Sequence, residues 1–68
     1  MILDNDDIVA YLKQLFPRRT FFIYFLPVTE KWIINYDTDL STRDARKLMV
    51  ETTNRFPDQV FQFERIPF

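Results

Sequence analysis

Apolar side chains recur at helical spacing close to the start of the chain. They are Ile8, Val9, Leu12, Leu15 and Phe16. This spacing places them on one side of a helix, where they can pack against a core. Residues 4–7, Asp-Asn-Asp-Asp, supply capping groups and negative charge, both of which are favoured at a helix start. Pro17 disfavours helical backbone at Phe16, so the pattern predicts a helix that ends there.

Two segments with strand character follow this helix. Residues 20–26 read TFFIYFL, apolar at nearly every position and rich in β-forming side chains. Residues 32–36 predict a second strand, joined to the first by a loop at residues 27–30. This loop sets Leu26 opposite Lys31, and that one pair fixes the register of all the others. The predicted pairs are Phe25–Trp32, Ile23–Ile34 and Phe21–Tyr36 on one apolar face, and Leu26–Lys31, Tyr24–Ile33 and Phe22–Asn35 on the other.

The second helix has the clearest boundaries in the sequence. Residues 41–44, Ser-Thr-Arg-Asp, approach a capping box with Asp in place of the preferred Glu. The core stripe that follows consists of Ala45, Leu48, Met49 and Thr52. Phe56-Pro57 then repeats Phe16-Pro17, and we interpret both pairs as helix exits rather than as signs of a duplication.

The end of the chain alternates between apolar and polar residues. From Gln59 onward, Phe61 and Phe63 alternate with polar neighbours, which predicts a half-solvated strand. Pro67 is expected to end this strand.

These elements predict an α+β fold in a single domain that spans residues 1–68. We expect a two-layer arrangement, a three-stranded antiparallel sheet with two helices packed on one face. Exposed apolar edges invite aggregation, so the apolar strand at 20–26 should lie in the centre, between the strand at 32–36 and the strand that starts at Gln59. Both helices would then cover one face of this central strand, which consists of Phe21, Ile23 and Phe25.

The composition removes most routes to catalysis. The chain contains no cysteine, histidine or glycine, which excludes disulfides, thiolate or imidazole metal sites and glycine-rich phosphate loops. Ser41, the only serine, is accounted for by helix capping. Asp37-Thr38-Asp39 matches the start of a calcium loop, but the glycine and the terminal glutamate of such a loop are missing. We therefore expect no enzymatic activity, no metal and no cofactor.

Charge and hydropathy favour a soluble protein. Nine Lys and Arg residues oppose ten Asp and Glu residues, which gives a formal net charge of −1 and little attraction to polyanions. No apolar run approaches membrane-spanning length, and residues 1–7 lack the layout of a signal peptide. We expect a cytoplasmic protein without a membrane partner, of the small accessory or regulatory type that bacteria and phages encode.

The predicted sheet has helices for one face only, so its other face is a candidate binding surface. The apolar side chains expected there are Phe22, Tyr24, Leu26, Ile33 and Val60. Apolar surface with a polar rim commonly marks a protein interface. The hypothesis is a protein-interaction module that binds another protein or forms a homodimer through this face. Alternatively, these side chains cover one another, or residues 66–68 fold back over them.

Nucleic-acid binding is the alternative hypothesis. The basic side chains that favour it are Arg18, Arg19, Arg43, Arg46 and Lys47. Phe22 and Tyr24 on the open sheet face could stack on bases. The nearly neutral net charge opposes this hypothesis, and Arg43 and Lys47, one helical turn apart, also fit the solvated side of a helix.

Overall fold

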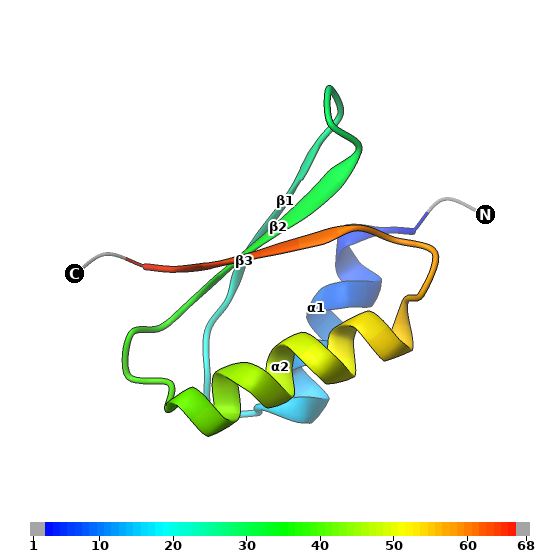
Figure 1. Ribbon diagram of the computed structural model, residues 1–68. Coiled ribbons are helices and arrows are strands. Elements are labelled where there is room, and N and C mark those ends of the chain that lie inside the picture. The colour runs from blue at the N-terminus through cyan, green and yellow to red at the C-terminus, as the bar shows by residue number, and fades with distance from the viewer. Residues whose placement is uncertain (1–2, 67–68) are drawn as a thin grey trace.

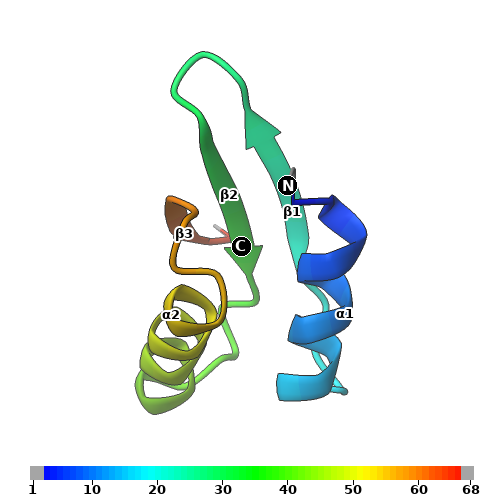
Figure 2. The ribbon, with the colours of Figure 1, turned by 90° about the vertical axis from the view of Figure 1, so that its right-hand side faces the viewer.

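Residues 3–66, the part of the chain that the computed structural model describes, form two helices and three strands. In chain order these are α1 (Asn5–Leu15), β1 (Phe22–Leu26), β2 (Lys31–Tyr36), α2 (Thr42–Arg55) and β3 (Phe61–Arg65). Both helices lie against one face of the sheet, and the β1–β2 hairpin extends beyond them (Figure 1, Figure 2). The predicted α+β class is confirmed. Pro67, where the last strand is expected to stop, lies outside the described residues, and so does most of the 66–68 segment considered as a cover for the open face.

Both helices begin and end at the positions that the sequence predicts. The Asp4 side chain accepts a hydrogen bond from the Asp6 amide, and the Asp7 side chain accepts one from the Asp4 amide, which forms a capping box. At the start of α2, the Ser41 hydroxyl accepts a hydrogen bond from the Asp44 amide at 3.1 Å. The C-cap of each helix is the phenylalanine of a Phe-Pro pair. The two prolines thus stop the helices as expected.

The register of the β1–β2 hairpin matches the predicted one. Phe22, Ile23, Tyr24, Phe25 and Leu26 face Asn35, Ile34, Ile33, Trp32 and Lys31, respectively. Phe21, expected opposite Tyr36, precedes the paired strand. The loop at residues 27–30 ends with Glu30 in the left-handed region, at φ 54°. A left-handed residue at the end of a hairpin loop suits the twist of the two strands.

The predicted strand order is wrong. The sheet has the order β1-β2-β3, so that β2 and not β1 is the central strand. β1 is antiparallel to β2, as expected, but β3 is parallel to it. Trp32, Ile34 and Tyr36 lie beside Phe61, Phe63 and Arg65 in the parallel pair. The sheet is therefore mixed, and the strongly apolar β1 forms one of its edges.

The position of α1 accounts for this order. α1 packs next to β1 on the helical face, and α2 takes the space beside β2 and β3 (Figure 2). A β3 strand beyond β1 would require α2 to pass over α1 on the same face, and connections in folded proteins rarely cross in this way. β2 is also the better covered strand, because Ile33 and Ile34, on opposite faces, are 2% and 0% exposed.

The core lies between the two helices and β2. Its buried members are Ile8, Leu12, Trp32, Ile34, Tyr36, Leu40, Ala45 and Leu48. On β1, Ile23 packs against this core while only partly buried, and Phe25 stays 42% exposed. Met49, predicted on the core stripe of α2, is also exposed. The helices cover the predicted face of the sheet, but they centre on β2.

One core position of α2 is polar. Thr52 is fully buried, and its hydroxyl finds no hydrogen-bond partner among residues 3–66. A buried polar group without a partner costs about 1–3 kcal/mol. We expect Thr52→Val to raise the free energy of unfolding by about 1 kcal/mol, equivalent to roughly 4–8 °C in Tm. Thermal unfolding followed by circular dichroism measures this shift.

Thr53→Val is the matched control for this substitution. Thr53 lies next to Thr52 on α2 but is exposed. The same chemical change should therefore alter the stability by less than about 0.5 kcal/mol there. Equal stabilisation at both positions would mean that the buried hydroxyl is not its cause.

Candidate functional site

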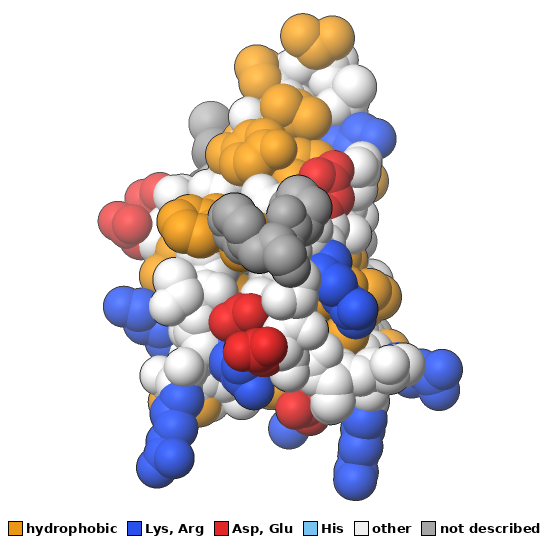
Figure 3. All heavy atoms as spheres, turned by 90° about the vertical axis from the view of Figure 1, so that its left-hand side faces the viewer, with side chains coloured by type: hydrophobic (Ala, Val, Ile, Leu, Met, Phe, Trp, Pro, Cys, Tyr) orange, Lys and Arg blue, Asp and Glu red, His pale blue; other side chains and the backbone are white. Residues whose placement is uncertain are grey.

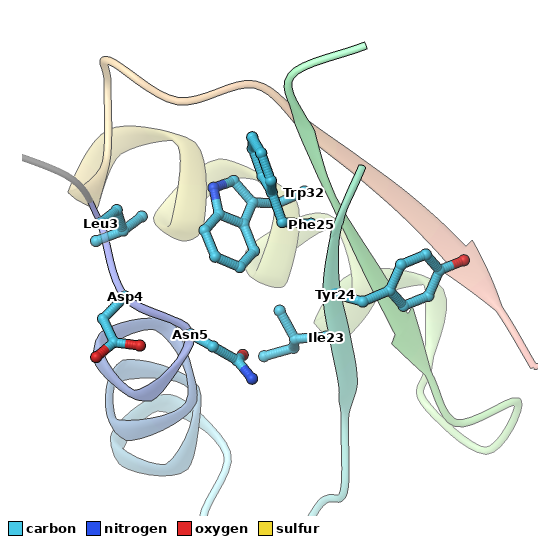
Figure 4. A pocket seen from close by; sticks show the side chains of 7 residues that line it. All are labelled: Leu3, Asp4, Asn5, Ile23, Tyr24, Phe25 and Trp32. Carbon is cyan, nitrogen blue, oxygen red and sulfur yellow. The ribbon is translucent and has the colours of Figure 1, made fainter. Parts of the chain in front are cut away.

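Three side chains of β1 emerge on the sheet face opposite the helices. Phe22, Tyr24 and Leu26 are 59%, 47% and 36% exposed, and no described element packs over them. Alternation along the strand places all three on one side, and Tyr24 points away from the side where Trp32 lies (Figure 4). We call Phe22, Tyr24 and Leu26 the β1 strip. Hydrophobic side chains gather toward the hairpin end of the molecule (Figure 3).

Ile33 lies on the same face of the sheet but does not form its surface. Its side chain is only 2% exposed. Tyr24 flanks it in register on β1, and Gln62 flanks it on β3. Its low exposure makes Ile33 a buried neighbour of the β1 strip rather than a contact residue.

Val60 is separated from the β1 strip by polar side chains. It directly precedes β3 and is 60% exposed. Lys31 Nζ donates a hydrogen bond to Gln62 Oε1 at 3.2 Å, and Gln62 Nε2 donates one to Glu64 Oε1 at 2.7 Å. This polar row runs from β2 to β3, so the open face has an apolar side on β1 and a polar side on β3.

The alternative hypothesis rests on basic side chains, and several Lys and Arg side chains project from the end of the molecule opposite the hairpin tip (Figure 3). Arg18 and Arg19 follow α1, and Arg43, Arg46 and Lys47 lie on α2. Arg19 Nη1 is 4.0 Å from Asp37 Oδ2. Lys47 Nζ lies 5.7 Å from the centroid of the Phe16 ring. Because α2 packs on the helical face, the sheet lies between its basic residues and the β1 strip.

Two hollows follow β1 on the helical side of the sheet. The first, of about 510 Å³, lies between the start of α1 and the hairpin, where Ile23, Phe25 and Trp32 face Leu3 and Asn5 (Figure 4). The second, of about 200 Å³, lies between α1 and the start of β1. It is lined by Val9, Leu12, Phe21 and Ile23, together with Lys13 and Arg19. Periodicity alone does not reveal such hollows, because each forms only when α1 packs beside β1.

Neither hollow brings together the groups of a metal centre. Within residues 3–66 there is no set of three or more His, Cys, Asp or Glu side chains placed to hold a metal ion. The acidic residue that borders the first hollow, Asp4, is engaged as the N-cap of α1. The arrangement at β1 is thus one of exposed apolar side chains and adjacent hollows.

The described segment from Leu3 to Ile66 contains no helix that is both long enough and apolar enough to cross a membrane. Its longest helix, α2, carries charged residues along its length. No family model, curated protein or solved structure matches the chain.

Proposed function

We propose that this chain is a non-enzymatic protein-interaction module whose contact surface is the β1 strip. The observation that carries this proposal is the 36–59% exposure of Phe22, Tyr24 and Leu26 on a face that no described element covers. Aromatic side chains are enriched at protein interfaces, where they bury a large area. Ile33, buried beside Tyr24 on β2, adds apolar packing next to the strip.

The polar side of the open face supports the same proposal. Protein interfaces combine an apolar centre with a hydrogen-bonding rim. The row from Lys31 through Gln62 to Glu64 provides such a rim beside the β1 strip. A surface of this type accepts a partner protein or a second copy of the chain.

Nucleic-acid binding is the second candidate, and the gathering of basic side chains at one end of the molecule favours it (Figure 3). Proteins that bind single strands combine a basic groove with aromatic side chains on which bases stack. In this fold, Phe22 and Tyr24 lie on the opposite side of the sheet from the basic residues of α2. This separation makes the protein interface the better supported function.

Phe22→Glu tests the proposal. A charge within the apolar contact should weaken association at least about tenfold. For self-association the measurement is mass by light scattering on a sizing column, from micromolar to millimolar protein. For another partner it is affinity capture with the wild-type chain and the variants. Circular dichroism should show an intact fold, since Phe22 is 59% exposed.

Val60→Glu is the matched control, because Val60 is equally exposed at 60% but lies beyond the polar row. It should leave association nearly unchanged, as should Arg18→Ala combined with Arg19→Ala. Equal effects of Phe22→Glu and Val60→Glu would contradict a contact centred on β1. Nucleic-acid binding would be favoured instead by a salt-sensitive mobility shift of nucleic acid that the double arginine variant loses. In that case Phe22→Glu should leave the mobility shift unchanged.

A further inference from the structure

The outer edge of β1 is unusual for an edge strand. No described strand pairs with it, although Phe22–Leu26 contains no charged residue and no proline, and its register has no bulge. Natural edge strands are commonly protected by such features, because their unpaired backbone groups otherwise recruit another strand. The opposite edge, β3, carries Gln62, Glu64 and Arg65. β1 is therefore the edge at which the sheet is able to continue.

The hydrogen bonds of β2 show how its peptide groups are oriented. The Trp32 amide donates to the Val60 carbonyl at 2.8 Å, and the Ile66 amide donates to the Tyr36 carbonyl at 2.9 Å. The even-numbered residues of β2 thus direct their N–H and C=O groups toward β3. Because successive residues of a strand alternate in this respect, Ile33 directs its groups toward β1.

The orientation on β1 follows from this alternation. Tyr24 is the register partner of Ile33, so its peptide groups point inward to β2. Ile23 and Phe25, on either side of it, then point their N–H and C=O groups toward the free edge. A strand that pairs there would form reciprocal hydrogen bonds with these two residues.

We propose that the β1 edge pairs in antiparallel fashion with the β1 edge of a second copy, about a twofold axis at Tyr24. β1 is five residues long and Tyr24 is its middle residue, so this register pairs the whole strand. Ile23 lies opposite Phe25 of the second copy in a hydrogen-bonded pair, and Tyr24 lies opposite its own equivalent in a non-hydrogen-bonded pair. Every cross-strand pair joins apolar or aromatic side chains, which stabilise one another.

The hollows beside β1 fit the second copy. In this register Phe25 of the second copy faces Ile23, the residue that lines both hollows. The loop that follows it, residues 27–30, then reaches the second hollow, where Phe21 and Val9 provide apolar lining. Val28 is 95% exposed in the single chain. In the pair it gains an apolar environment.

Charge complementarity also favours a second copy as the occupant. Glu30 is the only acidic residue between Phe22 and Tyr36, and it lies in the loop that approaches the second hollow. Lys31, which follows it, directs its ammonium group to Gln62 on β3. The second hollow carries Lys13 and also Arg19, whose guanidinium lies 4.0 Å from Asp37 of the same chain. The pairing is symmetric, so each copy offers Glu30 to Lys13 and Arg19 of the other. Complementary charges of this kind contribute mainly to orientation and to the rate of encounter.

This inference does not depend on the proposed function, because it rests on backbone groups at the edge rather than on the open face. The pairing also enlarges the apolar surface of the open face. Pairing places the β1 strips of both copies side by side in one continuous sheet. The apolar surface offered to a partner protein then contains Phe22, Tyr24 and Leu26 from each copy.

Disulfide trapping tests the pairing. The sequence contains no cysteine, so one introduced cysteine forms a disulfide only between chains. Opposite residues of a non-hydrogen-bonded pair have Cβ atoms about 4.5–5.5 Å apart, close to the reach of a disulfide. We expect Tyr24→Cys under mild oxidation to form covalent dimers at least roughly tenfold faster than Val60→Cys, although Val60 is the more exposed position.

A mixture of two variants tests the register itself. Phe22 lies opposite Leu26 of the second copy, so Phe22→Cys and Leu26→Cys should each dimerise slowly alone. Mixed in equal amounts, they should form the crossed disulfide at a rate close to that of Tyr24→Cys. Val28→Lys added to Tyr24→Cys should slow trapping roughly fivefold, because the loop would bring a positive charge to Lys13 and Arg19.

Either of two results would overturn the inference. The first is trapping of Val60→Cys as fast as that of Tyr24→Cys. The second is rapid trapping of Tyr24→Cys without the crossed product of Phe22→Cys and Leu26→Cys. The second result would indicate copies stacked face to face through the β1 strip, which excludes edge pairing and leaves the proposed function standing.

Discussion

Ile34→Ala should lower the free energy of unfolding by about 3–4 kcal/mol. Ile34 is 0% exposed on the central strand, between Ile23 and Phe63 in register, and it belongs to the core that both helices cover. Truncation removes apolar contacts and leaves a cavity that the surrounding elements fill only in part. A core of this size rarely supplies more than about 3–5 kcal/mol, so a large fraction of the variant should be unfolded at 25 °C.

Urea unfolding followed by tryptophan fluorescence measures this loss, because Trp32 is the only tryptophan and lies in the core. Ile34→Val is the milder variant, with an expected loss of about 1 kcal/mol. Ile23→Ala is the comparison for strand order. Ile23 lies on the edge strand and is only partly buried, so its truncation should cost about 1–2 kcal/mol. A larger loss at Ile23 than at Ile34 would contradict β2 as the central strand.

Local patterns predicted the helices and the hairpin because their determinants are close together in the sequence. The cap at Ser41 acts on residues of the same helical turn, and Pro17 and Pro57 act on the residue before each of them. The hairpin register depends on the length of the loop at residues 27–30, which the sequence shows directly. None of these features requires knowledge of how the layers pack.

Strand order depends on packing between distant elements. For strand order, the apolar pattern of β1 is compatible with two positions in the sheet. A segment that is apolar on both sides, such as Phe22–Leu26, fits a central strand. It also fits an edge strand whose outer side meets another chain. The space taken by α1 beside β1 decides between them, and no property of residues 20–26 contains that information.

The candidate site, like the fold, was predictable only where neighbouring residues in the sequence determine it. Alternation along β1 placed Phe22, Tyr24 and Leu26 on the open face, and all three are exposed. Ile33, expected on the same surface, is instead 2% exposed, and it lies on the central strand β2. Val60 is separated from the β1 strip because Lys31 contacts Gln62. This contact exists only because β2 and β3 pair in parallel.

Ile33→Ala should cost about 2–4 kcal/mol, although Ile33 lies on the sheet face without helices. Its side chain is 2% exposed, so truncation leaves a cavity beside Tyr24. Tyr24→Ala, at the neighbouring position in register, should cost no more than about 1 kcal/mol, because Tyr24 is 47% exposed. The two substitutions thus separate the buried position of the open face from its exposed contact surface.

The comparison is made by urea unfolding at low micromolar protein, where self-association contributes little to stability. The same variants are then compared for association at high concentration. Tyr24→Ala should weaken association while leaving the fold stable, which is the behaviour of an interface residue. A loss of about 3 kcal/mol or more at Tyr24, comparable to a full core truncation, would mean that the face is covered in the native chain. In that case the β1 strip is part of the core, and binding has to be sought elsewhere on the molecule.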